Sequence, residues 1–187
     1  MPLWRDVLET LLLALVAFAL LRLVVQNYRV EGPSMEPALH QGQFLVVNKL
    51  AYRLGTLQRG DIIVFRYPND PQRSFIKRVV GLPGDHLQIA RGQVQINGQP
   101  LVEPYVYEPG HYSHPPTVIE PDHVFVLGDN RDNSSDSHRW GSLPVRYIIG
   151  KTVLYYWPPR YWGLVQHQWL VEQPTSLRSM DMEFEPG

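Results

Sequence analysis

A long apolar run near the N-terminus constrains this chain more than any other feature of its sequence. The run VLETLLLALVAFALLRLVV covers residues 7–25, and only Glu9 and Arg22 interrupt it with charge. If these two side chains reach the membrane surfaces, about 18 residues form a helix of about 27 Å, close to the ~30 Å hydrocarbon thickness of a bilayer. The run therefore predicts a single transmembrane helix.

Two other interpretations compete with the membrane anchor: a cleavable signal peptide and a buried amphipathic helix. A signal peptide ends in a small-x-small cleavage site, whereas this run continues into RLVVQNYRV without such a pair. An amphipathic helix has a polar face, and none occurs between Leu11 and Leu21. The anchor is therefore favoured. Its orientation stays open, because charges of both signs precede the run and two arginines lie at its far end.

Short bursts of alternating apolar and polar residues follow the run, as in DIIVFRYP and DHVFVLGD. Glycine or proline ends nearly every burst, a spacing typical of short strands joined by turns. The segment RGQVQINGQPL predicts a hairpin with its turn at Asn97 and Gly98. Residues 105–122, rich in Pro, Tyr and His, predict a surface loop. The body of the chain is thus expected to be mostly β.

Three parts make up the predicted organisation. A membrane anchor helix covers residues 1–27, a β-rich domain covers residues 28–173, and a polar tail, expected to be flexible, covers residues 174–187. The length of 187 residues and the apolar share of 44% suit one domain with one core and one appended element.

Composition argues against several partners and chemistries. The net charge is −1 and no lysine-rich tail is present, so no nucleic-acid partner is expected. The chain has no cysteine, which excludes disulfides, zinc-thiolate sites and a cysteine nucleophile. A chain without cysteine suits a cytosolic or an extracytoplasmic compartment equally well.

The stretch EGPSMEPAL, residues 31–39, holds one serine, Ser34, in a turn constrained by Pro33 and Pro37. A serine nucleophile needs a base within hydrogen-bond reach and donors for the developing oxyanion. The candidate bases are seven histidines and only three lysines. A lysine among apolar neighbours can have its pKa lowered by several units and act as a base, whereas arginine keeps its proton.

Lys77 is the lysine whose neighbours suit this role. It lies in FIKRVVG, and in a strand its side chain would stand between those of Phe75 and Val79. Arg78 has the same kind of apolar neighbours on the opposite face. Spacing alone therefore leaves open which of the two basic residues turns inward.

The stretch GDNRDNSSDSHRWG, residues 128–141, concentrates acids, amides and serines. A calcium loop is not supported, because no start gives both the early ligands and the glutamate wanted at the twelfth position. A Ser-His-Asp triad through His138 or His123 stays open, although no G-x-S-x-G elbow is present. The histidines and acid of residues 111–123 lack regular ligand spacing, so no metal is expected.

Taken in order, these stretches resemble the type I signal peptidases, membrane-anchored serine proteases that remove signal peptides from exported proteins. The matching segments follow an anchor and cover about residues 8–141: EGPSMEPAL, RGDIIVFRYP, FIKRVVGLPGD and GDNRDNSSDSHRWG. The resemblance implies a mostly β, signal-peptidase-like catalytic domain after a single N-terminal transmembrane helix. It implies Ser34 as nucleophile and Lys77 as general base, a Ser-Lys dyad without histidine, metal or cofactor.

The resemblance also implies supporting residues. The Ser34 amide would donate to the oxyanion, and Gly32 stands where some members have a serine that supplies a second donor. Ser134 matches a serine that hydrogen-bonds the lysine. Asp129 and Asp136 match acids that hold the surrounding loop, in part through Arg78.

One departure from the family pattern concerns His138, which stands where many members have arginine. The ion-pair partner of Asp136 is therefore open, and Arg139 is a candidate. The source of the second oxyanion donor is open as well, because Gly32 has no side chain.

The implied substrates are preproteins cut after small residues at Ala-x-Ala sites. Such a peptide would bind extended, adding to a sheet edge. Its small side chains would enter shallow apolar pockets lined by Val30, Met35, Leu39, Phe75 and Ile76. The catalytic domain would face the extracytoplasmic side of the plasma membrane or of an equivalent internal membrane, and the oligomeric state is open.

An aromatic cluster near the end of the β-rich part has two interpretations. It would rest at the membrane interface, where Tyr and Trp are enriched, or pack at the end of a sheet. Its members are Tyr155, Tyr156, Trp157, Tyr161 and Trp162.

Two alternatives to the peptidase remain at this point. Self-cleaving repressors of the SOS type use serine and lysine on a related β fold, but they need a DNA-binding domain that residues 1–26 do not offer. An inactive, membrane-anchored β module that binds partners stays open, although Ser34 and Lys77 are both present.

Overall fold

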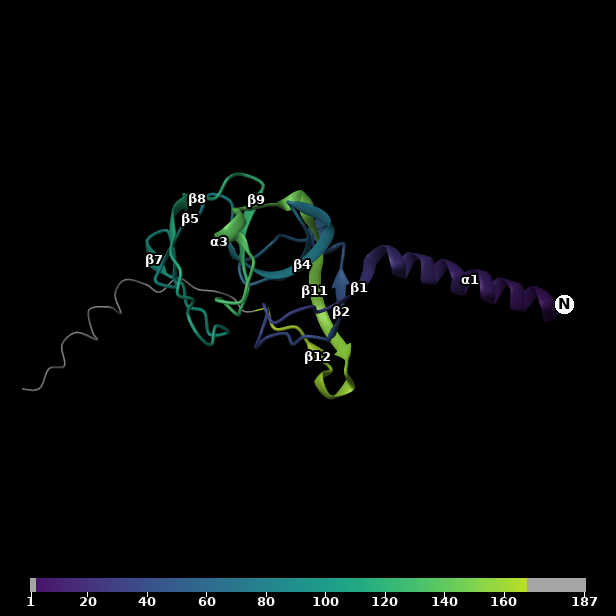
Figure 1. Cartoon of the computed structure of the whole chain (residues 1–187). Helices are drawn as coiled ribbons and strands as arrows, with labels where there is room; N and C mark the ends of the chain where they lie inside the picture. Colours follow the sequence, from purple (N-terminus) through teal and green to yellow (C-terminus); the bar gives the residue numbers. More distant parts are fainter. Residues whose placement is uncertain (1–2, 168–187) are drawn as a thin grey trace, which may run out of the picture.

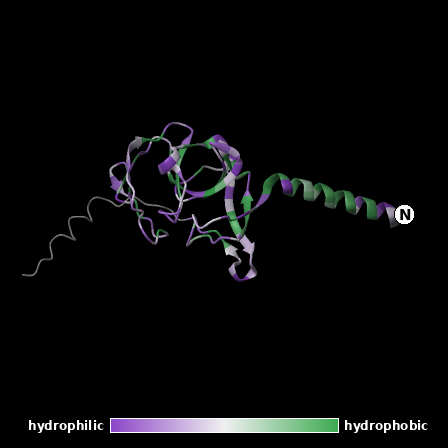
Figure 2. Cartoon of the chain, viewed as in Figure 1, coloured by the Kyte–Doolittle hydropathy of each residue, from purple (hydrophilic) through white to green (hydrophobic). Residues whose placement is uncertain are grey.

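The computed structural model describes residues 3–167, in which one long helix leads into a β body (Figure 1). Helix α1 (Leu3–Val24) projects alone from the body and is apolar along most of its length (Figure 2). Its segment Trp4–Val24 is long and apolar enough to cross a membrane, with mean hydropathy 2.4, and none of it is buried within the protein. This exposure excludes a core helix of a soluble domain and fits a membrane anchor.

Strand β1 (Val25–Arg29) follows α1 without a linker. The division into residues 1–27, 28–173 and 174–187 stays a prediction, and the proposed tail lies outside the described residues.

Two antiparallel sheets form the body. The larger has eight strands in the described part of the chain, in the order β1-β2-β11-β3-β4-β9-β10, and β12 pairs with β11. Besides β1, its strands are β2 (Phe44–Asn48), β3 (Ile62–Tyr67), β4 (Asp70–Gly81), β9 (His123–Leu127), β10 (Leu143–Pro144), β11 (Ile148–Trp157) and β12 (Gly163–Leu164). The smaller sheet has the order β7-β6-β5-β8, with β5 (His86–Ala90), β6 (Gln93–Ile96), β7 (Gln99–Pro100) and β8 (His114–Val118).

Short helical turns complete the described chain. They are α2 (Ala51–Leu54), α3 (Ser137–Trp140) and the 3₁₀ turns η1 (Val145–Tyr147) and η2 (Pro159–Tyr161). The mostly β class expected from the sequence is confirmed.

The predicted hairpin is confirmed, because β6 and β7 pair across Asn97 and Gly98, which both have positive φ, 52° and 81°. The surface loop predicted for residues 105–122 is wrong in part, since β8 lies within it and pairs with β5. Strand β8 is an edge strand, and its two prolines, Pro115 and Pro116, fall at a register shift where neither has a paired residue in β5.

Three clusters of buried apolar side chains fill the body. One joins β4 and β9 to the smaller sheet, and another lies among β3, β4, β9 and β10. The cluster that positions the site joins the turn after β1 to β2 and β3, and its buried members are Val30, Met35, Leu39, Leu45, Ile62 and Val165. Strand β4 contributes to all three clusters, which makes it a rigid support for the residues that it carries.

Candidate active site

Ser34 lies in the turn between β1 and β2, and apolar contacts hold this turn in place. Met35 and Leu39, which follow Ser34 in this turn, are fully buried, and the Leu39 amide donates to the Met35 carbonyl at 2.8 Å. Gly32 adopts φ +78°, a conformation in which a residue with a Cβ would be strained. The turn therefore presents the Ser34 side chain from a fixed backbone.

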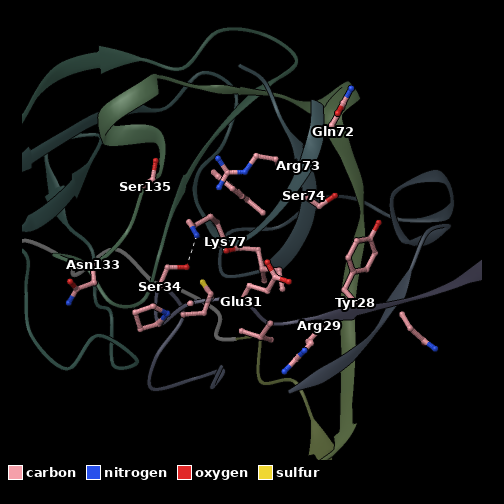
Figure 3. Close-up of a pocket in the computed structure, with 17 residues that line it drawn as sticks. Tyr28, Arg29, Glu31, Ser34, Gln72, Arg73, Ser74, Lys77, Asn133 and Ser135 are labelled. Atoms are coloured by element: carbon pink, nitrogen blue, oxygen red, sulfur yellow. Dashed lines mark hydrogen bonds between the residues drawn. The ribbon is translucent and has the colours of Figure 1, made fainter. Parts of the chain in front are cut away.

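Lys77 reaches Ser34 from β4, across 43 residues of sequence (Figure 3). Its Nζ donates to Ser34 Oγ at 2.7 Å and to the Ile76 carbonyl at 2.9 Å. The side chain is nearly enclosed, with Lys77 only 4% exposed. Burial lowers the pKa of Lys77 to about 8, against the charges of Asp136 and Asp129, which raise it. The geometry thus brings together the two residues that the sequence nominated.

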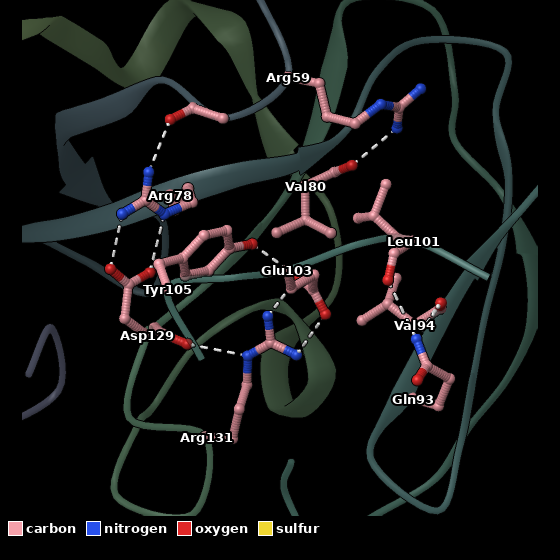
Figure 4. Close-up of polar contacts among 12 residues, drawn as sticks. Arg59, Arg78, Val80, Gln93, Val94, Leu101, Glu103, Tyr105, Asp129 and Arg131 are labelled. Atoms are coloured by element: carbon pink, nitrogen blue, oxygen red, sulfur yellow. Dashed lines mark hydrogen bonds and ion pairs between the residues drawn. The ribbon is translucent and has the colours of Figure 1, made fainter. Parts of the chain in front are cut away.

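Arg78 turns to the opposite side of β4 and is buried as well, so both basic residues of FIKRVVG point inward. Its guanidinium makes a bidentate ion pair with Asp129, with Nε–Oδ1 at 2.9 Å and Nη2–Oδ2 at 2.7 Å (Figure 4). The Tyr105 ring lies 3.9 Å from the guanidinium carbon. The predicted contact between Arg78 and Asp129 is present.

A second buried ion pair, which sequence reasoning missed, supports the same loop. Arg131 pairs with Glu103, and its Nε donates to the Gly128 carbonyl at 3.1 Å (Figure 4). Tyr105 donates to Glu103 at 2.6 Å, which links this pair to the Arg78 side of the site. Arg131 lies inside the motif GDNRD, but nothing near Glu103 in the sequence marks it as the partner.

The loop after β9 packs directly on the backbone of Ser34. The Asn130 amide donates to the Ser34 carbonyl at 3.1 Å. A Cβ at Gly128 would stand 2.4 Å from that carbonyl oxygen and 2.3 Å from Ser134 Oγ, so only glycine fits. Sequence reasoning assigned no role to Gly128, although the quoted motif begins with it.

Ser134 and Asp136 are placed differently from expectation. Ser134 is buried, but its hydroxyl has no hydrogen-bond partner among residues 3–167, so the expected bond to Lys77 is not formed. Asp136 makes no ion pair with Arg78 in this part of the chain. Its carboxylate accepts from the Gly128 amide at 2.9 Å and contacts His138 Nδ1 at 2.5 Å.

The open question about Asp136 is therefore answered by His138, which sits on the short helix that Asp136 caps. Arg139, the candidate named from the sequence, contacts His138 Nε2 at 3.2 Å instead of the acid. Tyr112 stacks on the His138 ring at 3.9 Å between centroids.

A cleft of about 650 Å³ opens beside Ser34 and Lys77 (Figure 3). Four of the five residues predicted to line the substrate pockets border it: Val30, Met35, Phe75 and Ile76. Leu39 does not border the cleft, and its side chain has no exposed surface within the apolar cluster beneath the turn. The structure thus places Leu39 in the core instead of in the wall of the cleft, where the sequence predicts it.

Two strand edges flank this cleft. Within residues 3–167, strand β1 pairs only with β2. Strand β4 pairs with β9 only from Arg78 onward, so in this part of the chain its edge from residue 70 to 77 lacks a partner on that side. Unpaired edges bind extended peptides through main-chain hydrogen bonds. No group of His, Asp or Glu suited to a metal ion occurs within the described chain.

Comparisons with known proteins agree with this arrangement. The family model described as "Signal peptidase, peptidase S26" matches residues 4–157. A probable signal peptidase I-1 of Synechocystis sp. is 43% identical over 171 residues, covering 86% of this chain and 87% of the relative. The signal peptidase I of Leptolyngbya laminosa is 39% identical, covering 84% and 81%. That of Bacillus caldolyticus is also 39% identical, covering 78% and 87%.

A solved signal peptidase I structure from Enterococcus faecalis aligns with TM-score 0.45 and 28% identity, covering 51% of this chain and 96% of that chain. This score adds nothing to the assignment, which depends on the sequence matches. Because the family model spans most of the chain and relatives near 40% identity cover more than four-fifths of it, the chain belongs to the signal peptidase family, peptidase S26.

Proposed function

We propose that this protein is a membrane-anchored serine endopeptidase that removes signal peptides from preproteins through a dyad of Ser34 and Lys77. Removal of signal peptides is the activity for which its family is named. The observation that carries the dyad is the 2.7 Å contact between Lys77 Nζ and Ser34 Oγ in an enclosed site beside the cleft. Family membership argues against an inactive module, and no DNA-binding unit precedes β1 in the described chain.

The chemistry follows from the position of the two side chains. Neutral Lys77 accepts the Ser34 proton as Oγ attacks the scissile carbonyl, and the protonated lysine then gives that proton to the leaving amine. Water hydrolyses the resulting ester with Lys77 again as base. The Ser34 amide donates to the oxyanion, and a backbone or water donor replaces the side chain that Gly32 lacks.

Substrate selection follows from the shape of the cleft. A preprotein segment binds extended against the free edges of β1 and β4, with alternate side chains directed at the wall. Met35 and Val30 border the cleft with little exposed surface, and we expect the pockets in this wall to be shallow and to accept only small residues, as at Ala-x-Ala sites. The anchor keeps the catalytic domain at the extracytoplasmic membrane surface, where a signal peptide leaves the bilayer.

Cleavage of a preprotein with an Ala-x-Ala site by the detergent-solubilised full chain tests this proposal. Ser34→Ala and Lys77→Met should each abolish cleavage, and Ser113→Ala, remote from the site, should leave it unchanged. A bulky residue in place of the last alanine before the cut should block it. Cleavage that survives Ser34→Ala or Lys77→Met would refute the dyad, and no cleavage by the parent protein would refute the function.

The side of the membrane on which the β body lies needs its own measurement. In sealed vesicles with the cytoplasmic face outward, an added protease should leave the β body intact until detergent opens the vesicles. Digestion without detergent would place the body on the cytoplasmic side and contradict the proposed location.

A further inference from the structure

A second cleft, of about 900 Å³, lies where α1 joins the β body. Its lining shares no residue with the cleft beside Ser34. One wall is the end of α1, with Leu20, Leu23 and Val24. The other walls come from residues 49–53 after β2 and residues 145–149 around η1. The cleft thus combines an apolar helix end with polar segments of the body.

The charges in this cleft have one sign. Among residues 3–167, four cationic residues line it and no Asp or Glu does: Lys49, Arg53, Arg66 and Arg146. The whole chain has 17 basic and 18 acidic residues, so the imbalance is a local property of this cleft. None of the four makes a salt bridge within residues 3–167, and all three arginines are exposed.

Lys49 fixes positive charge at the end of α1. Its Nζ donates to the Arg22 carbonyl at 3.0 Å, and its amide donates to the Val24 carbonyl at 2.8 Å. Carbonyls in the last turn of a helix lack partners within the helix and carry its negative dipole end. Lys49 therefore satisfies the groups that would otherwise repel an anion from this place.

The level at which the cleft lies relative to the bilayer follows from the length of α1. The apolar segment has 21 residues, which at about 1.5 Å per residue matches the hydrocarbon core of a bilayer of about 30 Å. Its C-terminal end, where the cleft opens, then lies at the level of the lipid headgroups.

We propose that this cleft binds the headgroup of an anionic phospholipid. The phosphate is held by Arg53, Arg66 and Arg146, and the acyl chains run along the apolar surface of α1 beside Leu20 and Leu23. A lipid suits this cleft better than a soluble anion because apolar and cationic walls meet in it. The bound lipid ties the β body to the membrane surface at a point separate from the peptide cleft, so the proposal does not depend on the proposed function.

Competition between two lipids on the full chain tests the proposal. Native mass spectrometry measures the ratio of phosphatidylglycerol to phosphatidylcholine retained from micelles containing equal amounts of both, with identical acyl chains. The parent protein should retain mainly phosphatidylglycerol. Arg53→Gln with Arg146→Gln should lower the ratio by about 25-fold, from about fivefold per cation near an anionic lipid.

A matched control removes two exposed arginines elsewhere, Arg91→Gln with Arg160→Gln, and should leave the ratio unchanged. Equal retention of the two lipids by the parent protein, or an equal fall in the control, would overturn the proposal. Displacement of phosphatidylglycerol by inorganic phosphate at constant ionic strength would also overturn it, because the cleft would then be a site for free anions. Circular dichroism checks folding; if the double variant unfolds, each single substitution should lower the ratio about fivefold.

Discussion

Raising the pH from 6 to 9 should increase the rate of cleavage by nearly two orders of magnitude, because in the proposed dyad only neutral Lys77 can accept the Ser34 proton. Burial lowers the pKa of Lys77 from 10.5 to about 8. At that pKa the neutral fraction is about 1% at pH 6, about 9% at pH 7 and about 90% at pH 9, so kcat/KM should rise about ninetyfold. Burial thus increases the reactive population at pH 7 about 300-fold over an ordinary lysine.

Initial rates with preprotein held below KM, at constant ionic strength in detergent, give kcat/KM at each pH. The substrate should have no ionisable side chain near the cleavage site. The chain has only three lysines, so ¹³C-lysine labelling can follow each ionisation by NMR. One signal should titrate near pH 8 and be absent from the Lys77→Met variant.

Three results would refute this reasoning. A kinetic midpoint near 6.5 would indicate a histidine as the base, and a midpoint near 10.5 would show that Lys77 is not desolvated. The NMR midpoint must also agree with the kinetic one, since a mismatch would mean that the rate reports another group.

Three further predictions concern stability and the loop behind the nucleophile. Between pH 7 and 9.5 the unfolded chain binds more protons at Lys77 than the folded chain, because the pKa of Lys77 is lower in the folded state. The free energy of unfolding should therefore rise by about 2 kcal/mol over this range, relative to the Lys77→Met variant. Denaturant titration at each pH measures it. Arg78→Leu leaves Asp129 buried and unpaired and should cost about 3–5 kcal/mol in the same assay, whereas Arg91→Leu on the surface should change stability by less than about 0.5 kcal/mol. Gly128→Ala should lower kcat by about a hundredfold, because its methyl group displaces the Ser34 backbone by about 1 Å; full activity in the cleavage assay would contradict the close packing of this loop.

Local features were predictable because they depend on neighbours in the sequence. The continuous apolar run indicates the helix, and Asn97 and Gly98 indicate the hairpin turn through their tolerance of positive φ. Strand β8 was missed because its prolines are typical of loops, and an edge position that tolerates them is a property of the sheet. Local patterns therefore predicted most helices and strands but not the position of every strand in the sheets.

The candidate site also has residues that local patterns predicted and contacts that only the structure shows. The motifs nominated Ser34 and Lys77, but alternation along β4 treated Lys77 and Arg78 alike. Only the folded chain shows that both are buried, one against Ser34 and the other against Asp129.

The sequence by itself determined the anchor, the mostly β class and the residues that could carry chemistry, because apolar runs, turn residues and motif spacing act over a few positions. Only the tertiary structure decided that Leu39 belongs to the core, that His138 contacts Asp136 and that Gly128 packs against the Ser34 backbone. These contacts depend on which faces of distant segments meet, and alternation along one segment contains no information about its partner.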